Sequence, residues 1–339
     1  MSVIELIRCL PKCELHLHIE GSLEPELLMA LAKRNDVPIS FQSVEEVRQA
    51  YRFKDLQSFL DIYYNGASVL LHKQDFADLS FAYMTRAHQD CVRHTEVFFD
   101  PQTHTDRGVS FGCVVEGLLE GFNKGAAAYN VSFSLILSFL RHLSEEQGFA
   151  VLDTALPFLH HFAGVGLDSS ELGHPPEKFK NLFAKCRELG LRCVAHAGEE
   201  APPSYIWGAL KELKVERIDH GVQCFRDDEL VAHLVAHQIP LTCCPNSNTC
   251  LKIFPSYEMG NHISLLRRGL RVTINSDDPA YFGGYIGNNF ENLLEQGMTG
   301  EEAMQLAMNG FLASWLPEES IRKYCKEVTD VFEAWKAGK

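Results

Sequence analysis

The feature that most constrains the fold is a series of eight short, β-rich apolar runs separated by helix-like stretches. Strands that are buried on both faces and alternate with helices are typical of a parallel sheet. A count of eight favours a (β/α)8 barrel of the TIM type, which is an α/β fold. The predicted strands are Cys13–Ile19, Thr95–Phe99, Val131–Leu137, Gly164–Asp168, Arg192–His196, Arg217–His220, Ile239–Cys243 and Val272–Ser276.

The stretches between these runs predict the helices of the barrel and one insertion. Leu23–His94 is too long for one connecting helix, so we expect a helical insertion at about 23–94, after the first strand. Further helices are expected over about 285–339, one of them starting at Pro317–Glu319. Since such barrels routinely exceed about 250 residues, residues 1–339 are predicted to form a single domain. The clearest connecting helices are Pro176–Gly190, Pro202–Leu213, Asp227–His237 and Ser256–Gly269.

Charge and hydrophobicity narrow the classes of partner. A net charge of -14 argues against binding to nucleic acid or to an anionic membrane. The first residues carry Glu5, Arg8 and Lys12 where a signal peptide would be apolar, and no later run approaches about 18 apolar residues. The eleven cysteines include no C-x-x-C pair and fit reduced thiols. We therefore expect a cytoplasmic protein acting on a small molecule, and a homo-oligomer stays open.

Metal-binding side chains stand at the carboxyl ends of four predicted strands, where the active sites of such barrels lie. A lone buried histidine there is more often a satisfied core residue, but four such ends are hard to attribute to packing. The segments are "ELHLHIEGS" with His16 and His18, "CVAHAGEE" with His196 and Glu199, "RIDHG" with His220, and "VTINSDDP" with Asp277 and Asp278.

Three imidazoles and one carboxylate suit Zn²⁺, which in catalytic sites keeps one position for water. Glu199, just beyond Gly198, is the candidate general acid, and His220 is expected to orient the water and accept its proton. Asp278 is expected to hydrogen-bond the substrate, although a turn before Pro279 would also explain it. Each histidine ligand should donate its other N–H to an acceptor. The predicted ligands are His16, His18, His196 and Asp277.

Five segments in order, "PKCELHLHIEGSL", "HAGEE", "RIDHGV", "CCPNSN" and "TINSDDPAYF", resemble the adenosine and adenine deaminases of the amidohydrolase superfamily. The resemblance runs from Pro11 to about Phe282. It implies a barrel with one Zn²⁺ per subunit, the same four ligands, Glu199 as proton donor to the purine, and Asp278 as a contact to its imidazole side. The segment "GVGLDSS" lacks the lysine that bridges two metals in binuclear relatives.

Two departures from the nucleoside-specific members bear on the substrate. This chain has Glu20 where they usually have Asp, and Asp219 where they usually have Gly, so the resemblance implies carboxylates in the space that a sugar would fill. Phe53 and Leu56, in the insertion, are candidates for an apolar lid over the purine. The resemblance thus implies conversion of adenine to hypoxanthine and ammonia in purine salvage. Adenosine or an N6-substituted adenine are alternative substrates, and a non-catalytic purine- or metal-binding barrel is a remote alternative.

Overall fold

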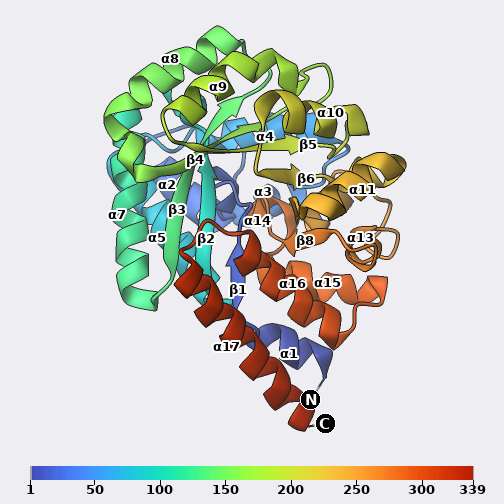
Figure 1. Cartoon of the computed structure of the whole chain (residues 1–339). Coiled ribbons are helices and arrows are strands. Elements are labelled where there is room, and N and C mark those ends of the chain that lie inside the picture. The colour runs from blue at the N-terminus through green and yellow to red at the C-terminus, as the bar shows by residue number, and fades with distance from the viewer. Residues whose placement is uncertain (1, 339) are drawn as a thin grey trace.

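Eight parallel strands form one sheet in the order β1 to β8 in the computed structural model, which describes residues 2–338 (Figure 1). Each of the eight predicted runs overlaps one strand, and the (β/α)8 barrel is confirmed. The strands are β1 Lys12–Glu14, β2 Val92–Phe99, β3 Ser132–Leu140, β4 Phe162–Asp168, β5 Arg192–Ala197, β6 Arg217–His220, β7 Pro240–Cys243 and β8 Arg271–Ile274.

The barrel is joined between its first and last strands by the segments that follow β1 and β8. Leu17 pairs with Asp277 in a parallel bridge. The N–H of His18 donates to the carbonyl of Asp277, and the N–H of Asp277 donates to the carbonyl of His16, both at 3.0 Å. The predicted first strand, Cys13–Ile19, is too long, because β1 ends at Glu14. The N–H of Leu15 donates to the side-chain Oδ1 of Asn275 at 2.7 Å instead of to a neighbouring backbone, which interrupts the regular ladder.

Apolar side chains fill both sides of the strands, as buried parallel strands require. Val97 and Phe99 belong to the large core between the sheet and the helices, whereas Phe98 belongs to a separate cluster with Ile136 and Val194. The ring of Phe98 stacks on His18 with 5.0 Å between centroids. This inner cluster therefore forms a packed floor under the histidines.

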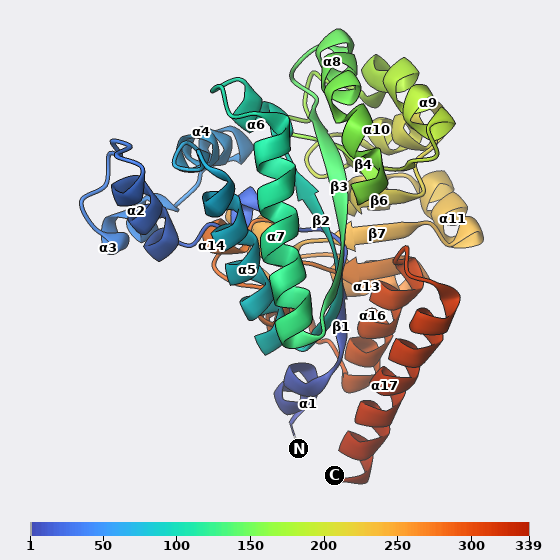
Figure 2. The ribbon, with the colours of Figure 1, turned by 90° about the vertical axis from the view of Figure 1, so that its left-hand side faces the viewer.

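The insertion after β1 folds as four helices, of which α2 and α3 project to one side of the barrel whereas α5 packs along α7, Phe111–Tyr129 (Figure 2). Its predicted end at His94 is slightly late, because β2 already begins at Val92. The helices are α2 Pro25–Arg34, α3 Val44–Ala50, α4 Leu56–Ala67 and α5 Lys73–Gln89.

The remaining helices surround the sheet, and α1 packs against α17 so that the two ends of the chain lie close together (Figure 2). None of the helices within residues 2–338 has the length and apolar character needed to cross a bilayer. They are α1 Val3–Cys9, α6 Pro101–Thr105, α7 Phe111–Tyr129, α8 Glu145–Ala155, α9 Lys180–Glu188, α10 Pro203–Gly208, α11 Asp228–His237, α12 Pro245–Cys250, α13 His262–Arg267, α14 Pro279–Phe282, α15 Ile286–Asn292, α16 Gly300–Ala313 and α17 Glu318–Ala337.

The predicted connecting helices match the structure unequally. Asp227–His237 corresponds to α11, and α17 begins at Glu318, within the expected Pro317–Glu319. The predicted helix Ser256–Gly269 begins too early, because α13 starts only at His262. The preceding Asn261 donates from its side chain to the carbonyl of Val222 at 2.8 Å, which ties this segment to the loop after β6 instead of letting it coil.

Candidate active site

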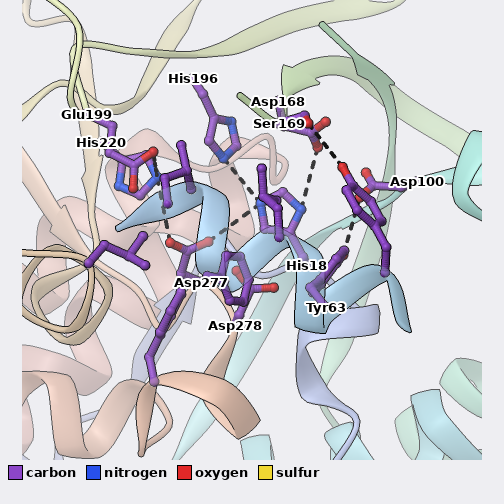
Figure 3. A pocket seen from close by; sticks show the side chains of 16 residues that line it. His18, Tyr63, Asp100, Asp168, Ser169, His196, Glu199, His220, Asp277 and Asp278 are labelled. Carbon is purple, nitrogen blue, oxygen red and sulfur yellow. Dashed lines mark hydrogen bonds and ion pairs between the residues drawn. The ribbon is translucent and has the colours of Figure 1, made fainter. Parts of the chain in front are cut away.

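The four predicted metal ligands lie together at the carboxyl ends of the strands. The Oδ1 atom of Asp277 is 3.3 Å from Nε2 of His16 and 3.5 Å from Nε2 of His18. The Nε2 atoms of His18 and His196 are 3.2 Å apart (Figure 3). All four ligand atoms lie within 4.8 Å of one another, and all four residues are buried. We call these four residues the ligand cluster.

The donor set of the ligand cluster fits a divalent cation. Nε2 of His16 is buried and has no hydrogen-bond partner among the described residues. A buried polar atom without a partner is costly, and a bound cation would satisfy it. Three nitrogens and one carboxylate oxygen are the donors that Zn²⁺ prefers.

Each histidine of the ligand cluster has an acceptor beside its other ring nitrogen. Nδ1 of His16 is 2.9 Å from Oγ1 of Thr242, whose hydroxyl donates to Oδ1 of Asp219 at 2.9 Å. Nδ1 of His18 is 3.5 Å from Oδ2 of Asp168, and Nδ1 of His196 is 3.6 Å from Oδ2 of Asp219. An acceptor at Nδ1 favours the proton there, which leaves the Nε2 lone pair free for a metal.

This arrangement corrects the predicted location of Asp219. The sequence places its carboxylate in the space of a sugar, but the side chain is 0% exposed and faces His16 and His196 from behind. It is also absent from the residues that line the pocket. Asp219 pairs with His196 between β5 and β6, and this register directs its carboxylate toward the ligand histidines.

Glu199 and His220 lie next to the ligand cluster. Oε2 of Glu199 is 3.7 Å from Nε2 of His220, and that Nε2 is 3.6 Å from Oδ2 of Asp277 (Figure 3). Burial and the nearby Asp277 carboxylate raise the pKa of Glu199 well above its ordinary value. A raised pKa favours the protonated form of Glu199, which is the form that a general acid needs.

The loop that carries Glu199 is held by a carboxylate that the sequence did not single out. Oε1 of Glu171 accepts from the N–H of Gly198 at 2.6 Å. Its Oε2 accepts from the N–H groups of Glu200 and Ala201, at 3.0 and 2.9 Å. Nothing in the sequence marks Glu171, because its partners are backbone groups that only the folded loop brings near.

A pocket opens above the ligand cluster and includes two of the five predicted substrate contacts, Asp278 and Leu56. Asp278 lines it, with Oδ1 buried and without a partner among the described residues, and Leu56 of α4 also lines it. The lining residues are His18, Leu56, Phe59, Leu60, Tyr63, Tyr64, Asp100, Asp168, Ser169, His196, Glu199, His220, Leu251, Asp277, Asp278 and Phe282.

Two predicted substrate contacts, Phe53 and Glu20, lie behind this lining. Phe53 packs edge-on against Phe59, with 5.3 Å between ring centroids, and so supports the lid from outside. Oε1 of Glu20 accepts from Nε2 of His104 at 2.8 Å and from the N–H of Asp100 at 3.2 Å. Both side chains thus support pocket residues and do not themselves line the pocket.

Two carboxyl groups of the lining, Asp100 and Asp168, were missed by the sequence analysis. Burial raises the pKa of both, and Asp168 raises that of Asp100 further. The hydroxyl of Tyr63 donates to Oδ2 of Asp100 at 3.2 Å (Figure 3). Their signal was present, because each carboxylate directly ends or follows a predicted strand.

Comparison with known proteins identifies relatives along nearly the whole chain. The family model described as adenosine deaminase matches residues 11–331. The chain is 55% identical over 325 residues to an adenine deaminase of Wolinella succinogenes, covering 96% of this chain and 98% of the relative.

Solved structures agree with the barrel. The structure of an adenine deaminase from Arthrobacter aurescens superposes with a TM-score of 0.93 at 46% identity, covering 94% of this chain and 98% of that chain. An amidohydrolase from Burkholderia ambifaria, solved with bound Zn, shares the fold with a TM-score of 0.90 at 24% identity, covering 99% of this chain and 96% of that chain.

Proposed function

Because this chain belongs to the adenosine deaminase family, we propose that it hydrolyses the 6-amino group of free adenine to give hypoxanthine and ammonia. The observation that carries the proposal is the buried carboxyl of Glu199, with its raised pKa, beside the ligand cluster in a pocket that also presents Asp278. The relatives named above as adenine deaminases support adenine as the substrate. The corresponding biological role is purine salvage in the cytoplasm.

We propose that His16, His18, His196 and Asp277 hold one Zn²⁺. When bound, this ion supplies Lewis-acid activation of the attacking water near neutral pH. His16→Ala should remove the ion, because it deletes one of three nitrogen donors, and elemental analysis of the purified variant measures this.

Different side chains of the pocket transfer the proton and bind the substrate. Glu199 donates its carboxyl proton to a ring nitrogen of the purine, which makes C6 more electrophilic. His220 and Asp277, which lie beside Glu199, position the attacking oxygen. Asp278 fixes the imidazole side of the ring through its buried Oδ1. Ammonia leaves when the tetrahedral centre collapses.

The position of Glu20 supports the base over the nucleoside. A Cβ on Gly21 would lie 1.9 Å from Oδ1 of Asp278, so the Glu20–Gly21 segment packs directly against that substrate contact. The Oε2 atom of Glu20 is buried and has no partner among the described residues. If Asp278 binds the imidazole side of the purine, this close packing supports a site with little room for the sugar of a nucleoside.

Turnover of adenine and adenosine by the zinc-loaded protein, followed by ultraviolet absorbance and ammonia release, tests the proposal. We expect adenine to be converted with the higher kcat/KM. Faster turnover of adenosine would overturn the choice of substrate, and N6-substituted adenines assayed in parallel address the other alternative. Binding of adenine without ammonia release would identify a non-catalytic barrel.

A further inference from the structure

A line of polar side chains leads from the backbone of α13 to the imidazole of His220. Oε1 of Gln296 accepts from the N–H of Ile263 at 3.1 Å, which identifies the other end of the amide as its NH₂ group. That Nε2 lies 2.9 Å from Nδ1 of His262. Nε2 of His262 lies 3.1 Å from Oδ1 of Asn248, and Nδ2 of Asn248 lies 3.4 Å from Nδ1 of His220.

These contacts have only one consistent direction, because an amide NH₂ group donates and cannot accept. Gln296 donates to Nδ1 of His262, so a neutral His262 carries its proton on Nε2. His262 then donates to Oδ1 of Asn248, which leaves the Asn248 NH₂ group to donate to Nδ1 of His220. A neutral His220 must therefore carry its proton on Nε2.

We propose that Gln296, His262 and Asn248, here called the relay, are positioning residues that hold His220 as the Nε2–H tautomer. His220 then donates a hydrogen bond to the attacking oxygen and is not the group that takes its proton. The proton passes instead to Glu199, whose carboxylate is free to accept it once it has given its own proton to the purine ring. This inference rests on the proposed function, and it replaces the proton-accepting role that the sequence suggests for His220.

The ligand cluster provides an internal contrast. Its three histidines face acceptors at Nδ1, namely Thr242, Asp168 and Asp219, whereas Nδ1 of His220 faces a donor. The ring centroid of His220 is only 4.6 Å from that of His16. The three histidines of the ligand cluster can therefore offer a lone pair at Nε2, whereas His220 can offer a proton at its Nε2.

The direction of the hydrogen bonds in the relay also argues against a second metal site at His220. His220, Cys244 and Asp277 bring three ligand atoms within 4.8 Å of one another. A metal on Nε2 of His220 would need the ring proton on Nδ1, directly against the NH₂ group of Asn248. The relay therefore favours a hydrogen-bond role for His220.

Burial protects Asn248 and His262, the two inner residues of the relay, from competing water. Asn248 is 0% and His262 1% exposed. Burial lowers the pKa of His262 to about 4, so the ring is neutral near pH 7, as the direction of the relay requires. A Cβ on Gly260 would lie 2.5 Å from Nε2 of Gln296 and 3.0 Å from Nδ1 of His262. The absence of a side chain at Gly260 therefore leaves the room in which Gln296 and His262 meet.

Nitrogen-15 NMR of the zinc-loaded protein, labelled at histidine, tests the tautomer directly. The signals of His220 are assigned by their loss in His220→Gln. We expect Nε2 to carry the proton and Nδ1 to show the shift of an unprotonated acceptor nitrogen. A proton on Nδ1 with a bare Nε2 would overturn the proposal. This spectrum is independent of turnover, so it remains decisive even if adenine proves not to be the substrate.

Asn248→Asp reverses the last contact, because a carboxylate accepts from His220 where the amide donates. We expect Nδ1 of His220 to become protonated and kcat for adenine to fall about a hundredfold or more, with KM and zinc content nearly unchanged. Asn246→Asp is the matched control. It places the same carboxylate on α12, but its side chain contacts Asn288 and Asn292.

The control should keep both the tautomer and the turnover of the parent. If Asn248→Asp switches the tautomer and keeps full kcat, the proposed role of the relay is wrong. If Asn248→Asp does not fold, the spectrum of the unaltered protein still decides the proposal.

Discussion

Oε1 of Glu171 accepts a 2.6 Å hydrogen bond from the backbone N–H of Gly198. Because Gly198 adjoins Glu199, this contact joins the loop after β4 to the proposed proton donor. Its Oε2 accepts from the N–H groups of Glu200 and Ala201. Glu171 is only 1% exposed and thus holds the backbone of this loop at three positions around Glu199.

We expect Glu171→Ala to lower kcat for adenine about ten- to a hundredfold while zinc stays bound, because a misplaced acid loses much of its catalytic effect. Steady-state kinetics and metal analysis measure both quantities. In a Glu199→Gln background, which should itself lose most of the rate, Glu171→Ala should cost little more. Additive losses in this double-mutant cycle would show that Glu171 acts elsewhere.

Asp219→Ala should weaken zinc binding about ten- to a hundredfold, because it removes the carboxylate behind His16 and His196. Competition with a chelator measures the affinity. With saturating zinc, KM for adenine should change little. A raised KM with unchanged zinc affinity would restore Asp219 to the substrate side of the site, where the sequence placed it.

Gly21→Ala should raise KM for adenine and leave zinc bound. The added Cβ would lie 1.9 Å from Oδ1 of Asp278, so that carboxylate has to move away from its position in the pocket. Adenine titration and zinc analysis of the variant distinguish this local effect from general unfolding. A KM equal to that of the parent would contradict the role of Asp278 in binding the purine.

The buried ion pair of Arg217 and Glu96, at 2.7 Å, should make the free energy of unfolding sensitive to acid. Burial alone would raise the pKa of Glu96, but the charge of Arg217 outweighs it and the pKa falls to about 2. A depressed carboxyl pKa contributes stability above the unfolded value of about 4.3, and this is lost as pH falls toward 2. The contribution is roughly 3 kcal/mol.

Chemical denaturation at a series of pH values checks this. Glu96→Gln should be less stable than the parent near neutral pH, and the difference should shrink between about pH 4 and pH 2. A difference that stays constant across this interval would exclude the ion pair as its source.

The outline of the site could be predicted because its residues follow recognisable strands. His16 and His18 are two positions apart, so alternation along an extended chain directs both rings to one side. The same rule would have found Asp100 and Asp168, which end or follow β2 and β4. The relay could not be found this way, because His262 lies after β7 and Gln296 lies after β8, and these two segments meet only in the folded barrel.

The sequence by itself determined the alternation of strands and helices and the four strand ends that carry metal-binding side chains, because both depend on local spacing. Only the tertiary structure decided what each side chain faces. The bridge between Leu17 and Asp277 joins residues 260 positions apart and brings that carboxylate to His16 and His18. His220 and Asp277 adopt positive φ angles, +62° and +61°, which break the alternation of an extended strand. The local sequence pattern could therefore not show that Asp219 faces the ring Nδ1 atoms of His16 and His196, whereas the adjacent His220 lines the pocket.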